Sequence, residues 1–454
     1  MAANRSILTG MIWFWYNVLF TIGFTLLLPR FLWRMVKRGG YRRHFLQRLG
    51  IYDAATREAL GERQRIWIHA VSVGELYVAF RFMEQFRARE PDCAFVLTTT
   101  TSTGHALARK QMKEPDLLLY FPVDSPWIMQ HVLTRVQPRL LVLVECELWP
   151  NLVRLCRRRG VAVTLINGRI SRKSFRGYHT LRLFTRRLLP LFDLLAVQSA
   201  EDRERLLALG APADRVEVMG SAKYEPGTPD ADGEASALRA LREAGMGEES
   251  LVWVGGSTWP GEEAILLDVY NELKTRFPAL GLVLAPRHAE RAPEVLETIA
   301  AKGRRVLRRS ELRAGMESAD ALPDAVLLVD TTGELRHFYA HASIIFVGKS
   351  LTQHGGQNVI EAAQYKKPVL VGPNMENFEA VMQEFREADA VCQVRDAEEL
   401  RTALESLLAS PALRTQLGSR AGRLIHDKAG ALDRTLDRVM PLALAREIPL
   451  RRAS

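Results

Sequence analysis

The sequence predicts an α/β protein with two units, each a parallel β-sheet covered by helices, preceded by one transmembrane helix. Three observations support this prediction. Short apolar strands alternate with amphipathic helices along both halves of the 454-residue chain, a Pro- and Gly-rich stretch separates the halves, and a charge-free apolar run lies near the N-terminus. Such alternation favours parallel strands joined by crossover helices. The expected parts are an anchor at 1–48, a first unit at 49–224, a linker at 225–237, a second unit at 238–430 and a C-terminal tail at 431–454.

Composition narrows the function classes. The net charge of +10 favours an anionic partner, either a membrane surface or a phosphorylated ligand. A nucleic-acid partner is not expected, because outside the N-terminal region no segment interleaves basic and aromatic residues. The four cysteines lack the paired spacing of a metal site and lie in or beside apolar runs. We expect Cys93, Cys146, Cys156 and Cys392 to be reduced and mostly buried, as in a cytosolic protein.

The N-terminal run from Ile7 to Pro29 contains one Asn and no charge. At 1.5 Å per residue it is long enough to cross the ~30 Å hydrocarbon layer of a bilayer, so we expect a single transmembrane helix. The following segment, Arg30–Arg48, contains seven Arg and Lys residues and no acid. The positive-inside rule therefore predicts that this flank and the rest of the chain are cytoplasmic. The same basic segment, with Trp33 and Phe45, would alternatively hold an anionic amphiphile at the bilayer surface.

The first unit is expected to contain seven strands, and polar residues gather where these strands end. In a doubly wound sheet, ligands bind beyond the carboxyl ends of the strands. Glu75 follows the first strand and opens a helical pattern that runs to about Arg87. A carboxylate in a first helical turn is held ionised by the helix dipole, which suits a general base. On these residues alone, a simple helix-start acid is the favoured interpretation. The predicted strands are Ile66–Val71, Ala94–Thr99, Leu117–Phe121, Leu140–Val144, Ala162–Ile166, Leu194–Val197 and Val216–Met219.

Two further charged positions follow strands of the first unit. Glu145 and Glu147 would point to the same side if the extended conformation continues past the fourth strand. They would either form a salt bridge to Arg169 or Arg172 or orient a ligand. Lys223 follows the last strand, as a solvated loop lysine or as a cation directed at developing negative charge.

The linker contains Asp230-Ala231-Asp232, the spacing that some sugar transferases use to hold a metal ion. Such a pair should follow a strand within a folded domain. We therefore expect this pair to be part of a solvent-exposed linker and predict no metal site.

The second unit repeats the alternation. Gly255-Gly256-Ser257-Thr258 is expected to follow its first strand as a turn whose backbone N–H groups approach an anion. Arg287 and His288 end the next strand, where they would bind a phosphate or form a plain surface turn. The predicted strands are Leu251–Val254, Leu282–Leu284, Ala325–Val329, Ile344–Val347 and Val369–Val371.

Two more loops of the second unit carry polar residues. The turn Asp330–Leu335 follows a strand. Asn358 and Glu361 have the spacing of an N-cap and the third helical residue, which indicates a capping arrangement. The same carboxylate would alternatively accept hydrogen bonds from the two hydroxyls of a ribose.

Ten sequence blocks together closely resemble bacterial 3-deoxy-D-manno-oct-2-ulosonic acid (Kdo) transferases. The blocks are IHAVSVGE, ECELWPN, INGRIS, MGSAKYE, GGST, APRH, DTTGEL, FVGKSL, GGQNVIEAA and VLVGPNMENF. The resemblance extends from the anchor to about Phe378. It implies a GT-B fold, in which two Rossmann-like domains face each other across a cleft, at the cytoplasmic face of the bacterial inner membrane. It further implies inverting transfer of Kdo from CMP-Kdo to the lipid A precursor, without a metal ion or another cofactor.

The resemblance also implies roles for individual residues. Glu75 matches the general base, and Glu147 and Lys223 match positions that stabilise the transition state. One departure is Gln357, where many members have His, because Gln cannot carry a charge; another is Val359, where Pro is common. The positions that match the CMP-binding blocks are Ser257, Arg287, His288, Gly333, Glu334, Leu335, Asn358, Val359, Ile360 and Glu361.

Two other functions fit part of the sequence. A membrane-bound GT-B enzyme that uses a UDP-sugar would share the glycine-rich and acidic blocks of the second unit, but not VSVGE and ELWPN. A non-catalytic nucleotide-sugar-binding protein would keep the CMP contacts and would have no need of Glu75.

Overall fold

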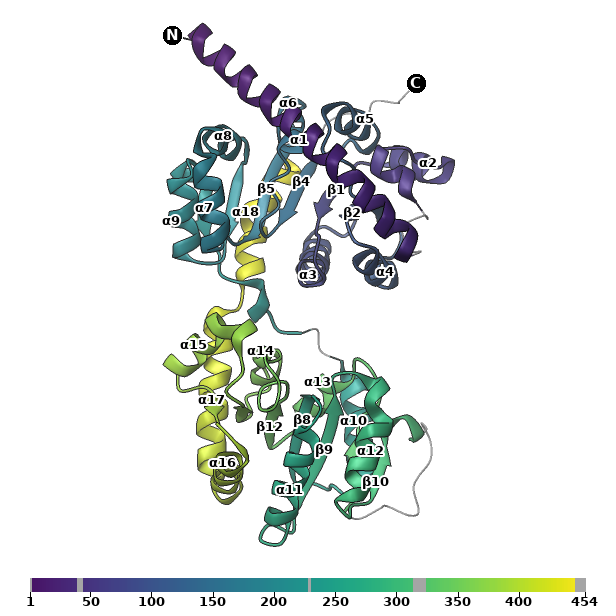
Figure 1. Ribbon diagram of the computed structural model, residues 1–454, viewed down its shortest axis with the longest axis vertical. Coiled ribbons are helices and arrows are strands. Elements are labelled where there is room, and N and C mark those ends of the chain that lie inside the picture. The colour runs from purple at the N-terminus through teal and green to yellow at the C-terminus, as the bar shows by residue number, and fades with distance from the viewer. Residues whose placement is uncertain (1, 39–43, 228–229, 313–323, 446–454) are drawn as a thin grey trace. The chain divides into compact units, whose positions relative to one another are not determined.

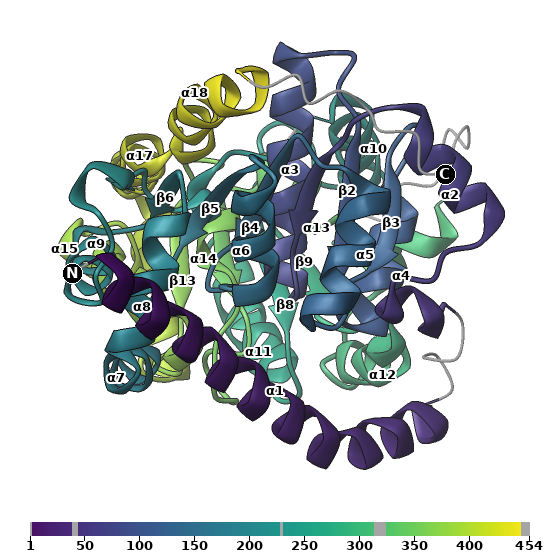
Figure 2. The ribbon, with the colours of Figure 1, turned by 90° about the horizontal axis from the view of Figure 1, so that it is seen from above.

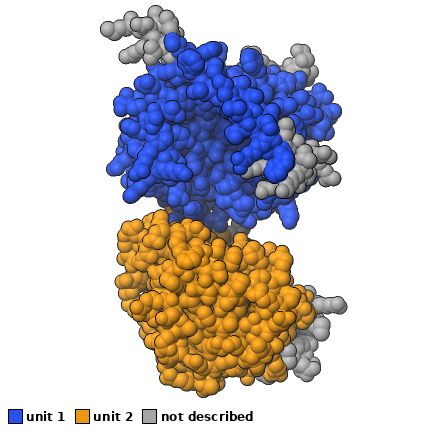
Figure 3. Space-filling view, in the orientation of Figure 1, with its two compact units in different colours: residues 1–225, 430–454 blue, residues 226–429 orange. Residues whose placement is uncertain are grey.

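The computed structural model describes residues 2–38, 44–227, 230–312 and 324–445 (Figure 1). The chain divides into two compact units, coloured separately in Figure 3. Unit 1 comprises residues 1–225 and 430–454, and unit 2 comprises residues 226–429. Each unit contains a seven-stranded parallel sheet. The predicted α/β class with two parallel sheets is therefore confirmed.

The sheet of unit 1 has the strand order β3-β2-β1-β4-β5-β6-β7, and all seven predicted strands are present. The strands are β1 (Ile66–His69), β2 (Phe95–Thr99), β3 (Leu117–Tyr120), β4 (Leu140–Val144), β5 (Ala162–Gly168), β6 (Leu194–Val197) and β7 (Val216–Val218). The α-helices are α1 (Ala2–Arg38), α2 (Ala54–Glu62), α3 (Val73–Arg89), α4 (Ser102–Gln111), α5 (Pro126–Val136), α6 (Pro150–Arg158), α7 (Arg172–Thr180), α8 (Arg182–Leu188), α9 (Ala200–Ala208) and α18 (Ala431–Leu444). Short 3₁₀ turns are η1 (Phe45–Leu49), η2 (Leu189–Leu191), η3 (Ala213–Arg215) and η4 (Ala222–Tyr224).

Helices cover both faces of this sheet, which explains why its central strands are mostly apolar. All five residues of β4 are buried. Leu141 and Leu143 pack with α5 and α6 on one face, whereas Leu140, Val142 and Val144 pack with α3 and α18 on the other. A parallel strand buried on both sides reads as a continuous apolar run. Charged side chains after β1 and β4 therefore lie beyond the ends of these strands.

The expected C-terminal tail is partly a helix of unit 1. In α18, Leu432, Leu436 and Val439 recur at helical spacing and pack in the same core cluster as Leu76 and Phe82 of α3. Residues 446–454 lie outside the described residues. The expectation of a separate tail is wrong for α18, because its apolar stripe completes the core of unit 1.

The linker is also shorter than expected, because α10 (Ala231–Glu243) begins within it. Asp230 caps this helix by accepting a hydrogen bond from Gly233 N at 3.0 Å. Its carboxylate lies 3.1 Å from Arg336 and 3.3 Å from His337. Asp230 is thus a helix cap of unit 2 rather than part of a solvated linker. Its neighbour in the expected metal spacing, Asp232, lies exposed in the first turn of α10.

At the other end of the expected linker, Glu225 belongs to unit 1. This residue is buried, and its carboxylate accepts a hydrogen bond from Leu432 N at 2.9 Å. The start of α10 could not be predicted from composition, because its small residues show little apolar periodicity.

The sheet of unit 2 has the order β10-β11-β9-β8-β12-β13-β14. Its strands are β8 (Leu251–Thr258), β9 (Leu280–Pro286), β10 (Val306–Arg308), β11 (Val326–Leu328), β12 (Ile344–Val347), β13 (Val369–Val371) and β14 (Cys392–Gln393). The helices are α10, α11 (Glu262–Lys274), α12 (Ala292–Ala301), α13 (Leu335–His341), α14 (Val359–Ala363), α15 (Glu379–Glu387), α16 (Ala397–Ala409) and α17 (Pro411–Lys428), with 3₁₀ turns η5 (Ala289–Arg291), η6 (Arg309–Glu311) and η7 (Glu376–Phe378). The sequence prediction missed β10 and β14, which are short strands at the two sheet edges.

The glycine pair of unit 2 is not a turn after the first strand. Gly255 and Gly256 lie inside β8 and pair with both β9 and β12. A Cβ at Gly256 would collide with the hydroxyl of Tyr339, so this glycine makes room for a buried side chain. Ser257 has φ 55° at the point where the β8–β9 register shifts, so it is the extra residue of a β-bulge. The expectation of a free anion-binding turn at Gly255–Thr258 is therefore wrong.

A fully buried carboxylate, Glu262, connects the chain after β8 to the chain after β12. Its oxygens accept hydrogen bonds from Trp259 N at 2.9 Å and Lys349 N at 2.8 Å. They also accept hydrogen bonds from Ser350 N and Leu351 N, both at 2.9 Å. A buried carboxylate is stable when it is satisfied in this way. Glu262 thus fixes the two loops that border the carboxyl edge of this sheet.

We expect Glu262→Ala to destabilise unit 2 by about 3–5 kcal/mol, because four backbone N–H groups lose a fully buried carboxylate as their acceptor. The measurement is denaturant unfolding followed by the fluorescence of the unit 2 tryptophans. Glu272→Ala on the same helix is the matched control, because Glu272 is exposed and its ion pair with Arg401 is long, at 3.9 Å. Its expected effect is below about 0.5 kcal/mol. Similar losses in both variants would contradict this role of Glu262.

Candidate functional site

Four adjacent or nearby strands of unit 1 end in polar loops at the same edge of the sheet. Glu75 lies after β1, Glu145 and Glu147 lie after β4, Asn167 is the second-last residue of β5, and Lys223 lies after β7. Because all these strands are parallel, their carboxyl ends share one edge. The three residues predicted to act in catalysis, Glu75, Glu147 and Lys223, are therefore on the same edge of one unit.

Glu75 is held by the turn that precedes its helix. Ser72 is the N-cap of α3, and its Oγ accepts a hydrogen bond from Glu75 N at 3.2 Å. Glu75 Oε2 accepts a hydrogen bond from Val71 N at 2.8 Å. The side chain is only 7% exposed. Glu75 therefore has a fixed carboxylate at the end of β1, which is more than a solvated helix-start acid would show.

Glu145 and Glu147 do not lie on a continued strand. β4 ends at Val144, and Glu145 has φ 62°, in the left-handed region. The expectation that an extended backbone places both side chains on one side is therefore wrong. In the part of the chain that the structure describes, neither carboxylate forms an ion pair with Arg169 or Arg172 within 4.0 Å, so the salt-bridge interpretation is wrong as well.

The two carboxyl groups nevertheless interact with Glu75. Burial and the negative charge of Glu75 raise the pKa of Glu147 to about 7. Burial and Glu75 also raise the pKa of Glu145, whereas Lys223 and Arg169 act in the opposite direction. Glu145 and Glu147 are therefore harder to ionise than free carboxyl groups, both because they are partly buried and because Glu75 is near.

Lys223 is positioned by an asparagine that sequence reasoning did not select. Asn167 Oδ1 accepts a hydrogen bond from Ala222 N at 3.0 Å, and its Nδ2 donates to Glu145 Oε1 at 3.4 Å. Asn167 has φ 51°, a conformation that Asn tolerates better than most residues. Although Lys223 is exposed as a residue, partial desolvation of its ammonium group lowers its pKa, Arg169 acts in the same direction, and Glu145 opposes both. Asn167 thus joins the carboxylates to the lysine loop.

Unit 2 presents a second group of polar residues at the carboxyl edge of its sheet. Arg287 and His288 follow β9 and are exposed, and Arg287 N donates to Thr258 O at 3.1 Å. The His288 ring lies 5.6 Å from the ring of Trp259, in an edge contact. The Lys349 ammonium also contacts Trp259, at 4.6 Å from the centroid of its ring. Arg287 and His288 therefore lie beside Thr258 and Trp259, the two residues that follow Ser257.

Trp259 and Lys349 were not selected as site residues from the sequence. Lys349 has φ 56°, an uncommon conformation for a residue other than Gly. Its backbone N–H is bound by Glu262, whose role no sequence motif indicated. The only sequence signal was the position of both residues directly after strands.

The predicted turn at residues 333–335 offers less free chemistry than expected. The carboxylate of Glu334 accepts hydrogen bonds from Thr331 and from Arg309, with Arg309 Nη2 at 2.8 Å. Gly333 is exposed with φ 92°, and Leu335 begins α13. A ligand at this turn would therefore meet backbone groups rather than an unengaged Glu334 carboxylate.

The residues around Asn358 form the helix cap that their spacing indicated. Asn358 is the N-cap of α14, and its Oδ1 accepts a hydrogen bond from Ile360 N at 3.1 Å. Val359 and Ile360 are buried in the core. Glu361 is half-buried and contributes to raising the pKa of Tyr365. Only backbone groups of Val359 and Ile360 could contact a ligand.

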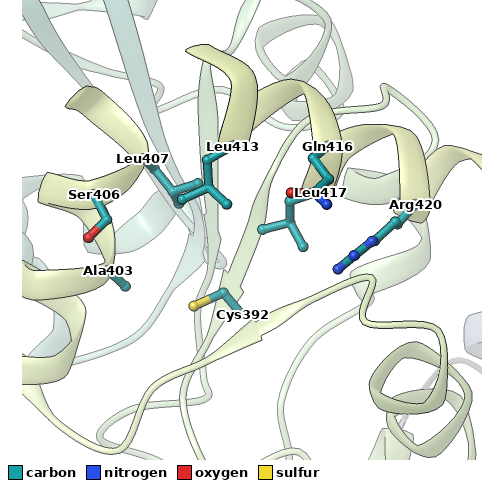
Figure 4. A pocket seen from close by; sticks show the side chains of 8 residues that line it. All are labelled: Cys392, Ala403, Ser406, Leu407, Leu413, Gln416, Leu417 and Arg420. Atoms are coloured by element: carbon teal, nitrogen blue, oxygen red, sulfur yellow. The ribbon is translucent and has the colours of Figure 1, made fainter. Parts of the chain in front are cut away.

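The described residues also form a pocket, but no cluster of side chains that could hold a metal ion. A pocket lies between α16, α17 and β14, where Cys392, Leu407, Leu417 and Arg420 line it (Figure 4). It contains none of the predicted site residues. Within the described ranges, no group of three or more His, Cys, Asp or Glu side chains could hold a metal ion.

The cysteines are less buried than predicted. Cys93 and Cys156 are buried, Cys392 is half-buried and Cys146 is exposed. All four are free thiols. Cys146 is exposed because it lies in the turn between Glu145 and Glu147 rather than in β4.

Comparison with known proteins shows the family to which this chain is similar. Residues 43–226 match the family described as 3-deoxy-D-manno-octulosonic-acid transferase, and residues 317–423 match glycosyl transferases group 1. The chain is 31% identical to the 3-deoxy-D-manno-octulosonic acid transferase of Haemophilus influenzae over 408 residues, covering 89% of this chain and 93% of the relative. It is 32% identical to the Bordetella pertussis protein of the same name over 421 residues, covering 89% and 94%.

A solved structure shows the same fold at low identity. The crystal structure of a UDP-N-acetylglucosamine 2-epimerase from Listeria monocytogenes superposes with a TM-score of 0.52 at 12% identity, covering 85% of this chain and 98% of that chain. This likeness concerns the fold alone. The extent and identity of the two curated relatives decide the family: the chain belongs to the 3-deoxy-D-manno-octulosonic acid (Kdo) transferases, which are glycosyltransferases.

Proposed function

We propose that this chain transfers Kdo from CMP-Kdo to the lipid A precursor, with inversion at the anomeric carbon and without a metal ion. The observation that carries the proposal is the fixed Glu75 carboxylate beside Glu145, Glu147 and Lys223, in a Kdo transferase. A sugar hydroxyl that attacks a ketosidic carbon needs a base, and Glu75 supplies one in a defined orientation. We further propose that the reaction takes place at the cytoplasmic face of the bacterial inner membrane.

The proposed reaction is a single displacement. Glu75 accepts the proton of the acceptor hydroxyl while the hydroxyl oxygen forms a bond to the anomeric carbon of Kdo. The bond between that carbon and the phosphate oxygen breaks, and CMP leaves with the electron pair. One displacement at one carbon inverts its configuration. The base belongs to unit 1 and the proposed donor contacts belong to unit 2, so both units are needed.

Glu147 and Lys223 are proposed to stabilise the transition state in different ways. With a pKa near 7, Glu147 is partly protonated at neutral pH and can donate a hydrogen bond, which an ionised carboxylate cannot do. Lys223 provides positive charge beside Glu145 and so limits the repulsion that a negatively charged substrate would meet.

The donor is proposed to bind along the carboxyl edge of the unit 2 sheet. Arg287 supplies an exposed permanent cation for the phosphate, beside His288 and Ser257. Backbone groups at Gly333 and at residues 358–361 would complete the CMP contacts that the family resemblance implies. Gln357 would contribute a hydrogen bond and no charge.

Glu75→Gln should lower kcat by about 10²–10⁴-fold, because the amide cannot accept the proton. The amide oxygen can still accept the hydrogen bond from Val71 N, so CMP-Kdo binding and the unfolding midpoint should not change. Turnover is measured by CMP release and donor binding by calorimetry. Glu84→Gln, an exposed position on the same helix, should retain full activity. Unchanged turnover in Glu75→Gln would remove Glu75 as the base.

Glu147→Gln tests the raised pKa through the pH dependence of stability. The ordinary pKa of 4.5 is raised to about 7, so between these values the folded state binds more protons than the unfolded state. The free energy of unfolding of the native chain should therefore fall as pH rises from 5 to 8. The variant lacks this loss, so its stability relative to the native chain should be higher at pH 8 than at pH 5. A difference that is the same at both pH values would contradict the shift.

Metal independence and the number of transferred sugars are tested together. Purified protein is incubated with CMP-Kdo and a tetraacylated lipid A precursor in EDTA, and the product is analysed by mass spectrometry. We expect the mass of the acceptor to increase by whole Kdo units in EDTA. No product from folded protein would refute the proposed function, whereas product lost only on chelation would refute the metal-free mechanism.

A further inference from the structure

Helix α1 is long and apolar enough to cross a membrane between Gly10 and Arg30. The first turns of this stretch, from Trp13 to Asn17, are docked on unit 1 through one face. Trp13 is only 4% exposed and its ring packs 5.4 Å from the ring of Phe184 in α8. Tyr16 stacks on Phe184 at 5.1 Å, and Figure 2 shows α1 passing alongside α8.

The docked face also makes polar contacts with a buried group of unit 1. The Tyr16 hydroxyl donates to Asp124 Oδ2 at 3.0 Å, and Asn151 Nδ2 donates to Asn17 Oδ1 at 2.8 Å. Asp124 is fully buried and accepts hydrogen bonds from the backbone N–H groups of Asn151 and Leu152. The Arg154 guanidinium lies 4.8 Å from the Trp13 ring. These contacts belong to the packed body of unit 1 and not to a lipid environment.

The chain after α1 returns to the same unit. Arg48 in η1 donates to Thr100 O at 2.7 Å, and Gln47 Oε1 accepts a hydrogen bond from Tyr120 N at 3.1 Å. Both ends of the apolar stretch are thus flanked by contacts with one unit. A helix that crossed the bilayer would instead carry Trp13 and Asn17 toward the side of the membrane opposite to Arg48.

The length of α1 also argues against a transmembrane position of the docked helix. If residues up to Asn17 are occupied by unit 1, twelve residues remain before Arg30, which is about 18 Å at 1.5 Å per residue. This is short of the ~30 Å hydrocarbon layer. The docked helix therefore cannot also span the bilayer.

An apolar stripe runs along the face of α1 opposite to Trp13, and beyond Phe20 the helix is also exposed on the Trp13 side, where Leu27 is 63% exposed. At about 100° per residue, the positions in this stripe fall within about 80° of one another and on the far side from Trp13 and Phe20. All its members are more than half exposed. They are Met11 at 53%, Trp15 at 55%, Leu19 at 66%, Ile22 at 52%, Leu26 at 74% and Trp33 at 62%.

The neighbouring surface carries positive charge. The α7–α8 segment, residues 171–192, contains no acidic residue. Leu181 and Leu183, beside Phe184, are 58% and 64% exposed. The exposed basic residues of this segment are Arg172, Lys173, Arg176, Arg182 and Arg186. Basic residues next to exposed apolar ones suit a bilayer with anionic lipids.

We propose that α1 lies in the plane of the membrane interface, with its apolar stripe in an anionic bilayer, and does not span it. The α7–α8 segment adds electrostatic attraction to the same surface. Asp124 and Asn151 follow or adjoin the carboxyl ends of β3 and β4, the edge that also carries Glu75 and Glu147. The bilayer surface is thereby brought beside the edge that would use a lipid acceptor. The proposal concerns membrane attachment and does not depend on Kdo transfer.

The first test locates the N-terminus relative to the membrane. Ala3→Cys is placed in a full-length Cys146→Ser background and treated with a membrane-impermeant maleimide, in spheroplasts and in inside-out membrane vesicles. The unaltered chain, with its exposed Cys146, marks the side of the soluble units. We expect Cys labelling at position 3 from the same side as Cys146. Labelling from the opposite side, or from neither side, would overturn the proposal.

The second test measures the contribution of the basic segment. Full-length protein is diluted from detergent into vesicles, and co-flotation is compared for phosphatidylglycerol and phosphatidylcholine. Arg176→Glu with Arg182→Glu should weaken partition into anionic vesicles roughly tenfold, and leave neutral vesicles little affected. The matched control is Lys110→Glu with Lys113→Glu, two exposed charges at the far end of α4, which should show no such loss. Equal effects of the two pairs would overturn the role of α7–α8.

Discussion

Burial of the central parallel strands on both faces is the constraint on which the rest of unit 1 depends. Every residue of β1 and β4 is buried, so these strands are almost entirely apolar, and the one polar side chain among them, His69, is hydrogen-bonded to Thr98. Charged residues therefore appear where these strands end, and the parallel arrangement gathers those ends on one edge. Glu75, Glu145 and Glu147 lie there for this reason.

Crowding three carboxyl groups at an edge has an electrostatic consequence. Burial and the negative charge of Glu75 raise the pKa of Glu147 and of Glu145, and Lys223 and Arg169 oppose the rise for Glu145. Different protonation states are then available at neutral pH within one site: a partly protonated Glu147 beside a Glu75 carboxylate that is fixed by a backbone hydrogen bond. An enzyme that must accept one proton and stabilise negative charge elsewhere benefits from this division.

Segments distant in the sequence complete unit 1. α18 follows unit 2 in the chain but supplies Leu432 and Leu436 to the core beneath α3, the helix that carries Glu75. α1 precedes the first strand but is docked through Tyr16 on Asp124.

In unit 2, the single carboxylate of Glu262 joins loops nearly ninety residues apart in the sequence. Each of these contacts supports the core or the carboxyl edge of a sheet without forming part of a recognisable motif.

The sequence by itself determined the two parallel sheets, all seven strands of the first, and the strand ends where Glu75, Arg287 and His288 lie, because apolar periodicity and strand-end polar residues are local signals. It could not reveal that Gly255 and Gly256 belong inside β8, that Asp230 caps α10, or that Asn167, Trp259 and Glu262 hold the edges together. These depend on neighbours brought close by folding, and a turn, a strand and a linker can share one composition. Likewise, hydropathy identified an apolar helix long enough to span a bilayer, but only the tertiary structure decided which of its faces is already occupied by protein.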